Sequence, residues 1–238
     1  MNRLNFYDTS VWNHFHKPGE VVEMRILDAT GTFAGRQAYR KTLSGYFDSH
    51  ADFCKVLKAT GGIDYSGTYF TLQVIDPRLI GRAFNRLKIS DQTTSDNNIL
   101  AYRWLPLDFD PVRPSGISSS EVELQASLEL RERVVPIVQE RYGLPSPVLA
   151  MSGNGCHALF RLPDWLADQE HRDIMKGLLK AISHEFRTET VSIDAAVWNP
   201  ARVWKLYGTT AHKGDIVPAG EYHDARPHRE SYIETLGE

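Results

Sequence analysis

The pattern of apolar and polar residues predicts a mixed α+β chain and is clearest in its second half. Residues 99–110 are apolar and aromatic with no breaker before Pro106, as in a buried strand. A long helical pattern follows, which capping boxes at Ser118 or Ser120 would begin and Gly143 would end. The later elements predicted here are strands at 148–152 and 156–162 around a Gly-Asn-Gly turn, a helix at 168–187 and a strand at 190–193.

The order of these elements is β-α-β-β-α-β, the split βαβ or ferredoxin-like (RRM-like) arrangement. Each crossover in that topology leaves room for one strand, so the spatial order becomes fourth, first, third, second. His157 on the third strand and Asp194 after the fourth would then meet Asp108 and Asp110 on the first. We expect this arrangement, which we call the palm, to occupy residues 99–238.

Residues 1–98 are less regular and are expected to form an N-terminal α/β lobe packed against the palm. Strands are predicted at 21–27 and 67–75. Asp48 can cap a short helix running to Lys58, and Pro77 suits the first turn of a helix running to about Leu87. The polar segment 90–98 is predicted to be a disordered connection.

Composition narrows the class of protein. A hydrophobic content of 42% and a charged content of 24% are those of an ordinary globular domain, and no apolar run approaches the ~20 residues that span a bilayer. With a polar N-terminus and two cysteines, the chain is expected to be cytoplasmic, with no membrane partner and no disulfide framework. A net charge of −3 argues against a protein that coats nucleic acid over its whole surface, but not against a local basic groove.

Asp108 and Asp110 end the first palm strand, where side chains i and i+2 point to the same face about 7 Å apart. Two carboxylates held there repel each other and lose hydration unless a cation lies between them. Carboxylate oxygens are the ligands that Mg²⁺ and Mn²⁺ prefer. The pair therefore predicts half of a metal site, although Asp-x-Asp also ends many strands as a turn or capping device.

Two other segments could complete such a site. Asp194 would add a third carboxylate to a two-metal centre for in-line displacement, or would simply cap a helix from residue 195 onward. His157 follows Ser152-Gly153-Asn154-Gly155-Cys156, where the glycines would let backbone N–H groups approach a phosphate. Taken alone, that turn is an ordinary hairpin and His157 a structural histidine.

Basic residues near these motifs could neutralise a triphosphate. Arg202 and Lys205 are three apart and would share a face if 199–205 is helical. Arg113 and Ser115 lie in the loop directly after the strand that carries Asp108 and Asp110. This loop could reach a sugar or the phosphates. Each feature also has a plainer explanation, as a solvated basic pair or a connecting loop.

Upstream, Arg78, Arg82 and Arg86 recur every four residues opposite apolar positions. On one helix they would form a basic ridge suited to a DNA backbone, although such ridges are usually solvated faces. Tyr69 is among several aromatic residues that could stack on bases or pack in the core.

Three motifs together resemble the signature of the archaeo-eukaryotic primase superfamily: Asp108-Phe109-Asp110, Ser152-Gly153-Asn154-Gly155-Cys156-His157 and Ile193-Asp194. The longer wordings Leu-Asp-Phe-Asp-Pro-Val-Arg-Pro-Ser-Gly-Ile-Ser-Ser and Arg-Val-Trp-Lys-Leu-Tyr-Gly-Thr resemble its bacterial primase-polymerase branch of phage, plasmid and CRISPR-associated proteins. The resemblance covers about residues 100–215. Asn85-Arg86-Leu87-Lys88 is similar to the same branch with less specificity, and adds Lys88 to the candidate DNA contacts.

The resemblance implies a DNA primase and polymerase that uses two Mg²⁺ or Mn²⁺ ions. Asp108, Asp110 and Asp194 would be the metal ligands and His157 a triphosphate contact. Single-stranded DNA template, a primer and NTP or dNTP would be the ligands, with a fused or separate helicase or other replication module as a further partner. Two cysteines cannot supply the zinc module that many such primases carry.

Other functions stay open at this stage. The protein could extend primers without starting them, or could be a non-catalytic single-strand-binding module on the same fold. A metal nuclease would also use a carboxylate cluster. Three converging carboxylates argue against a pure binder, because they would repel DNA phosphates, and the basic pocket residues favour transfer over hydrolysis.

Overall fold

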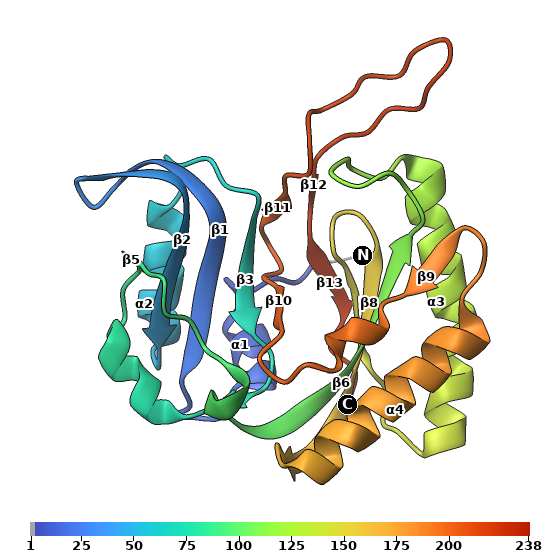
Figure 1. Cartoon of the computed structure of the whole chain (residues 1–238), viewed down its shortest axis with the longest axis horizontal. Coiled ribbons are helices and arrows are strands. Elements are labelled where there is room, and N and C mark those ends of the chain that lie inside the picture. The colour runs from blue at the N-terminus through green and yellow to red at the C-terminus, as the bar shows by residue number, and fades with distance from the viewer. Residues whose placement is uncertain (1–2) are drawn as a thin grey trace.

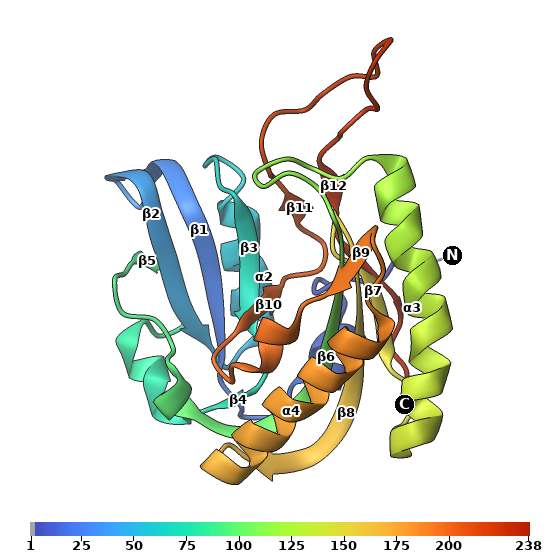
Figure 2. The ribbon, with the colours of Figure 1, turned by 45° about the vertical axis from the view of Figure 1, so that its right-hand side comes forward.

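The computed structural model describes residues 3–238, which build two main sheets whose neighbouring strands are all antiparallel (Figure 1). One sheet is drawn mostly from the first third of the chain and the other from the remainder. Helix α2 packs behind the first sheet, while α3 and α4 lie over one face of the second (Figure 2). The expectation of a mixed α+β chain is therefore confirmed.

The second sheet has the order β13-β7-β8-β6-β4, and β9 also pairs with β6. Its four strands β9, β6, β8 and β7 are thus neighbours in the order that the sequence predicts. Ser120 begins α3 with a capping box to Glu123, and Gly143 ends it at a φ of 60°. The elements are β4 (Val74–Ile75), β6 (Ile99–Pro111), α3 (Glu121–Tyr142), β7 (Val148–Met151), β8 (Cys156–Leu166), α4 (Gln169–Phe186), β9 (Val191–Ile193) and β13 (Tyr232–Thr235).

The first sheet has the order β10-β3-β1-β2-β5. A two-residue turn joins β1 to β2, with Ala34 and Gly35 both at positive φ, as the right-handed twist of a hairpin requires. Ser49, rather than Asp48, caps α2. The elements are α1 (Thr9–Phe15), β1 (Val22–Phe33), β2 (Arg36–Phe47), α2 (His50–Ala59), β3 (Gly67–Thr71), β5 (Lys88–Ile89) and β10 (Val203–Lys205).

The chain crosses between the two sheets in both directions. Strand β4 precedes residue 98 yet belongs to the second sheet, and β10 follows it yet belongs to the first. The predicted strand at 67–75 is accordingly two strands in two sheets, β3 and β4. Phe6, Phe70 and Trp104 lie in one continuous core that joins both parts of the chain. This shared core fixes the two sheets relative to each other.

The helix predicted from Pro77 to Leu87 is wrong. Only a short 3₁₀ helix, η1 (Pro77–Arg82), forms, and Asn85 then takes a positive φ of 45° that no right-handed helix accommodates. Arg86 therefore lies beyond the helix, and no single helical face carries the three arginines as a ridge.

Segment 90–98 is ordered, contrary to the prediction of a disordered connection. The buried Thr94 donates its backbone N–H to Glu23 at 3.1 Å. Asp96, in the 3₁₀ helix η2 (Asp96–Asn98), accepts hydrogen bonds from Asn199 at 2.9 Å and Ala201 at 3.2 Å. Thr94 and Asp96 thus tie this segment to distant parts of the protein.

The remaining elements are η3 (Ala195–Trp198), β11 (Thr210–Ala211) and β12 (Arg229–Glu230). Within residues 3–238, no helix combines the length and the apolar character that crossing a membrane requires.

Candidate active site

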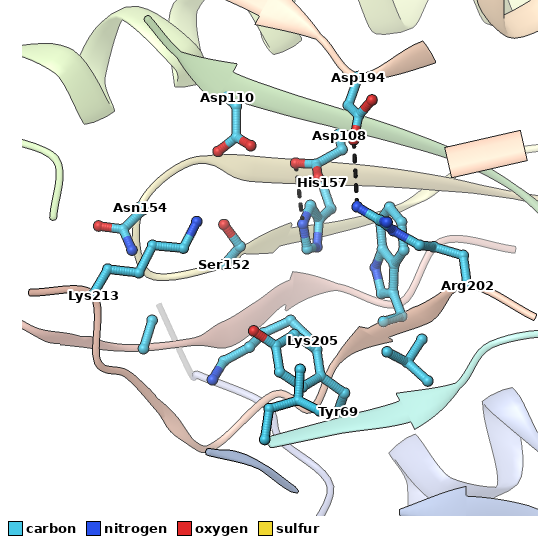
Figure 3. Close-up of a pocket in the computed structure, with 14 residues that line it drawn as sticks. Tyr69, Asp108, Asp110, Ser152, Asn154, His157, Asp194, Arg202, Lys205 and Lys213 are labelled. Carbon is cyan, nitrogen blue, oxygen red and sulfur yellow. Dashed lines mark ion pairs between the residues drawn. The ribbon is translucent and has the colours of Figure 1, made fainter. Parts of the chain in front are cut away.

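A cavity of about 320 Å³ opens between the two sheets and collects most of the candidate residues (Figure 3). Leu27 and Tyr69 line it from the first sheet, and the three predicted metal ligands line it from the second. The other lining residues are Ser152, Asn154, His157, Arg202, Val203, Trp204, Lys205, Ala211 and Lys213.

Strand pairing builds the acidic side of this cavity. Asp108 lies directly opposite His157 in the β6–β8 ladder, and their Oδ1 and Nε2 atoms are 3.4 Å apart. On the other edge of β6, the backbone N–H of Asp194 donates to the carbonyl oxygen of Asp108 at 2.9 Å. The predicted strand order therefore brings Asp108, His157 and Asp194 together although they are far apart in the sequence.

The two carboxylates of β6 oppose each other's ionisation. Asp108 and burial together raise the pKa of Asp110 to about 6. Burial also disfavours the charged form of Asp108, but His157, Lys213 and Arg202 together outweigh it and leave the pKa of Asp108 below its ordinary value. Arg113 lies 3.7 Å from Asp110 and compensates only part of this charge. The pair is short of positive charge.

Asp194 has the cap geometry that its simpler interpretation predicts. Its Oδ1 atom accepts from the backbone N–H of Ala196 at 2.7 Å, at the start of η3, and Oδ2 lies 3.6 Å from Arg202. Its side chain also lines the cavity, so capping does not remove it from the site.

The donor set suits a hard divalent cation that shares its ligands with a substrate. No three His, Cys, Asp or Glu side chains in the described part of the chain converge closely enough to hold an ion unaided. Mg²⁺, however, is commonly bound by one or two carboxylates, with water and phosphate oxygens completing its octahedron. Asp108 and Asp110 fit that mode, because they supply two under-compensated carboxylates at a cavity wall.

The glycine turn presses closely against the acidic strand. Gly153 has a φ of 107°, and a Cβ on Gly155 would collide with the carbonyl oxygen of Phe109 and crowd Asp110. Asn154 is buried, and its Oδ1 accepts from the backbone N–H of Ser119 at 2.8 Å, which sets the orientation of its amide. The turn thereby holds Ser152 and Asn154 at the cavity beside the carboxylates.

A basic wall faces the carboxylates from strand β10 and the segment after it. Residues 203–205 form a strand rather than the helix on which a shared face for Arg202 and Lys205 depended, yet both residues line the cavity. Lys205 lies opposite Tyr69 in the ladder, is 6% exposed and donates to the carbonyl oxygen of Thr210 at 2.9 Å. Burial, aided by Lys213, lowers the pKa of Lys205 to about 7.

Lys213 is the charged lining residue of this cavity that the sequence motifs did not predict. It lies at the base of segment 212–228, which projects away from both sheets (Figures 1 and 2). Its amino group faces the space near Asn154 and Asp110 in Figure 3. No spacing relative to the recognised motifs marks it, because only the return of the chain from β11 brings it there.

Other candidates lie outside the main cavity. Arg113 and Ser115 line an adjoining cavity of about 580 Å³ that shares Asp110 and Lys213 with the first.

The four candidate DNA contacts are dispersed. Arg78 is bound to Asp76 at 2.6 Å, and Arg82 donates to Tyr46 at 3.3 Å and to the carbonyl oxygen of Thr93 at 3.1 Å. Arg86 and Lys88, together with Arg36, line a separate basic hollow on the first sheet.

Comparison with known proteins gives no further guide, since no protein-family model matches this sequence and no curated protein is similar to it.

Proposed function

We propose that this protein is a template-dependent DNA primase and polymerase, a nucleotidyltransferase of the archaeo-eukaryotic primase type. One observation carries the proposal: an under-compensated carboxylate pair, Asp108 and Asp110, faces a wall containing Arg202, Lys205 and Lys213 across a single cavity. A nucleoside triphosphate with divalent cations has the complementary charges, since cations satisfy the carboxylates and phosphates satisfy the basic wall.

The arrangement suits attack of a primer 3′-hydroxyl, or that of a first nucleotide, on the α-phosphate with loss of pyrophosphate. Asp108, Asp110 and Asp194 would hold Mg²⁺ or Mn²⁺, which when bound supply charge neutralisation and activate the attacking oxygen. His157 would donate from Nε2 to a phosphate oxygen, while Arg202 and Lys205 neutralise the triphosphate. Most of the catalytic contribution would come from positioning and electrostatics.

The fold supports the same interpretation. The neighbour order β9-β6-β8-β7, with α3 and α4 as crossovers, supports the proposal of a ferredoxin-like palm. We propose that the first sheet contributes template contacts, for which the basic hollow around Arg86 and Lys88 is better placed than the internally paired Arg78 and Arg82. Single-stranded DNA and a replication module such as a helicase would be the partners.

A synthesis assay tests the proposal. Purified protein is given single-stranded template, with or without a primer, labelled nucleotides and either Mg²⁺ or Mn²⁺. Short products from unprimed template are expected. Product from primed template alone would reduce the function to primer extension, degradation of the template would indicate a nuclease, and binding with neither outcome would indicate a non-catalytic module.

A further inference from the structure

A buried hydrogen-bonded chain lies directly behind His157. The indole Nε1 of Trp204 donates to the hydroxyl oxygen of Tyr207 at 3.0 Å, and that oxygen lies 2.8 Å from Nδ1 of His157. Tyr207 is fully buried, and within residues 3–238 its hydroxyl has no other hydrogen-bond partner. The other ring nitrogen of His157, Nε2, faces Asp108 at 3.4 Å on the cavity side.

The chemistry of the three groups sets the direction of this chain. An indole N–H can only donate, so Tyr207 accepts from Trp204. The tyrosine proton then needs an acceptor, and Nδ1 of His157 is the one within reach. If Nδ1 carried a proton instead, the hydroxyl would be left with a buried proton and no acceptor, an arrangement that proteins avoid. Burial also raises the pKa of Tyr207 well above its ordinary value, so the hydroxyl keeps its proton.

Packing holds the imidazole in the plane that this direction requires. The rings of His157 and Trp204 lie 4.4 Å apart between centroids, and His157 is 4% exposed. Trp204 sits on β10 in the first sheet while His157 sits on β8 in the second. The hydrogen-bonded chain therefore makes the orientation of His157 depend on how the two sheets are placed relative to each other.

We infer that Tyr207 and Trp204 are positioning residues that fix His157 in the tautomer with Nδ1 as acceptor and the N–H on Nε2. The cavity then presents an N–H donor beside Asp108, directed at an incoming phosphate oxygen. The inference that this donor meets a nucleotide rests on the proposed function, whereas the tautomer itself does not.

The first test is the ring nitrogen spectrum of His157 in nucleotide-free, metal-free protein. Two-bond ¹H–¹⁵N correlations distinguish a protonated ring nitrogen from a bare one, and the His157→Ala spectrum identifies the signals. We expect Nδ1 to be bare in the wild type and a mixture of tautomers in Tyr207→Phe. A proton on Nδ1 in the wild type would overturn the inference, and that result does not require Tyr207→Phe to fold.

The second test is nucleotide affinity in a double-mutant cycle. Tyr207→Phe should weaken dNTP binding in the presence of Mn²⁺ by about tenfold, the lower part of the range for partners that orient a functional histidine. In the His157→Ala background the same substitution should have no further effect, because the positioned group is gone. An equal loss in both backgrounds would show a merely structural role and contradict the inference.

Tyr102→Phe is the matched control. Tyr102 is also buried, but its hydroxyl donates to the carbonyl oxygen of Trp198 rather than to the site, so its loss should leave dNTP affinity unchanged. If the wild type binds no nucleotide while Nδ1 is bare, the proposed function fails and the assignment of the tautomer stands. If the wild type binds nucleotide while Nδ1 of His157 is protonated, the assignment of the tautomer fails and the proposed function stands.

Discussion

Strand β6 carries two charge clusters that differ in how far the protein compensates them. Near its start, Arg103 is 2% exposed and donates to Asp164 at 2.8 Å and to Glu20 at 2.6 Å. Near its end, Asp108 and Asp110 share a cavity wall and have longer contacts, with Asp108 3.4 Å from His157 and Asp110 3.7 Å from Arg113. We call Arg103, Glu20 and Asp164 the closed cluster, because their charges are paired within the protein. We call Asp108 and Asp110 the open cluster, because their charges are only partly compensated.

The pKa directions express the difference. Hydrogen bonds from Arg103 hold the pKa of Asp164 well below its ordinary value, whereas Asp108 and burial raise the pKa of Asp110 to about 6. Each charge in the first cluster is stabilised by the fold. The carboxylates of Asp108 and Asp110, in contrast, can be fully compensated only by positive charge from outside the chain. Perturbed groups of the second kind mark functional sites more often than those of the first.

Neutralising the open cluster should produce the largest effect. Asp108→Asn with Asp110→Asn removes the cation ligands, so we expect synthesis to fall at least about 10³-fold. The fold should survive, because the change also removes like-charge repulsion. Product formation and circular dichroism measured together check this, and a variant that is folded and still active would show that the metal assignment is wrong.

Breaking the closed cluster should instead cost stability. Arg103→Met leaves Glu20 without its cationic partner and Asp164 with only Lys17, so we expect the free energy of unfolding to fall by about 2–3 kcal/mol. Urea denaturation measures it. The control Arg141→Met removes an exposed pair with Glu185 and should cost at most about 1 kcal/mol. Similar losses in both variants would remove the distinction between the clusters.

The raised pKa of Asp110 should make the folded protein less stable as the pH rises. This is opposite to the effect of the lowered pKa of Asp164 in the closed cluster. Asp110 keeps its proton in the folded state up to about pH 6, while the unfolded chain loses it near pH 4. Between those values the folded state binds more protons, so stability falls as pH rises. Allowing for solvent screening at this partly exposed group, wild type should lose about 1–2 kcal/mol relative to Asp110→Asn between pH 4 and pH 7. A pH-independent difference would contradict the raised pKa.

The basic wall should respond to nucleotide in a smaller but complementary way. Lys205, with a pKa of about 7, is mostly neutral at pH 8, and a triphosphate beside it should restore its charge. Calorimetry in two buffers of different ionisation enthalpy should therefore detect uptake of about one proton on dNTP binding. The uptake should vanish in Lys205→Met and be reduced but still present in Lys213→Met, because burial remains the main cause of the lowered pKa of Lys205. Equal uptake in all three proteins would place the proton elsewhere.

The acidic half of the site was readable from sequence because it depends on strand order. Once 99–110 is a strand within β-α-β-β-α-β, the topology alone puts Asp108 beside His157 and Asp194. The two ends of α3 could also be predicted, because Ser120 and Gly143 are local capping signals.

The basic half could be predicted only in part. Arg202 and Lys205 were expected near a triphosphate and do line the cavity, but the strand that places them there depends on pairing between distant segments. Residues 203–205 become a strand only by pairing with β3, and Tyr207 reaches His157 only through that pairing. Segment 90–98 looks disordered because its polar residues find their partners far away in the chain. Strand β2 was missed because many of its side chains are exposed and polar, which hides any apolar alternation.

The most direct test of the account is the amount of Mn²⁺ bound per chain, measured by electron paramagnetic resonance with a non-hydrolysable dNTP analogue present. We predict two ions bound to the wild type, and a loss of that binding in Asp108→Asn with Asp110→Asn. Equal binding by the two proteins, or no binding by the wild type, would contradict the claim that the open end of β6 is a cation site completed by a nucleotide.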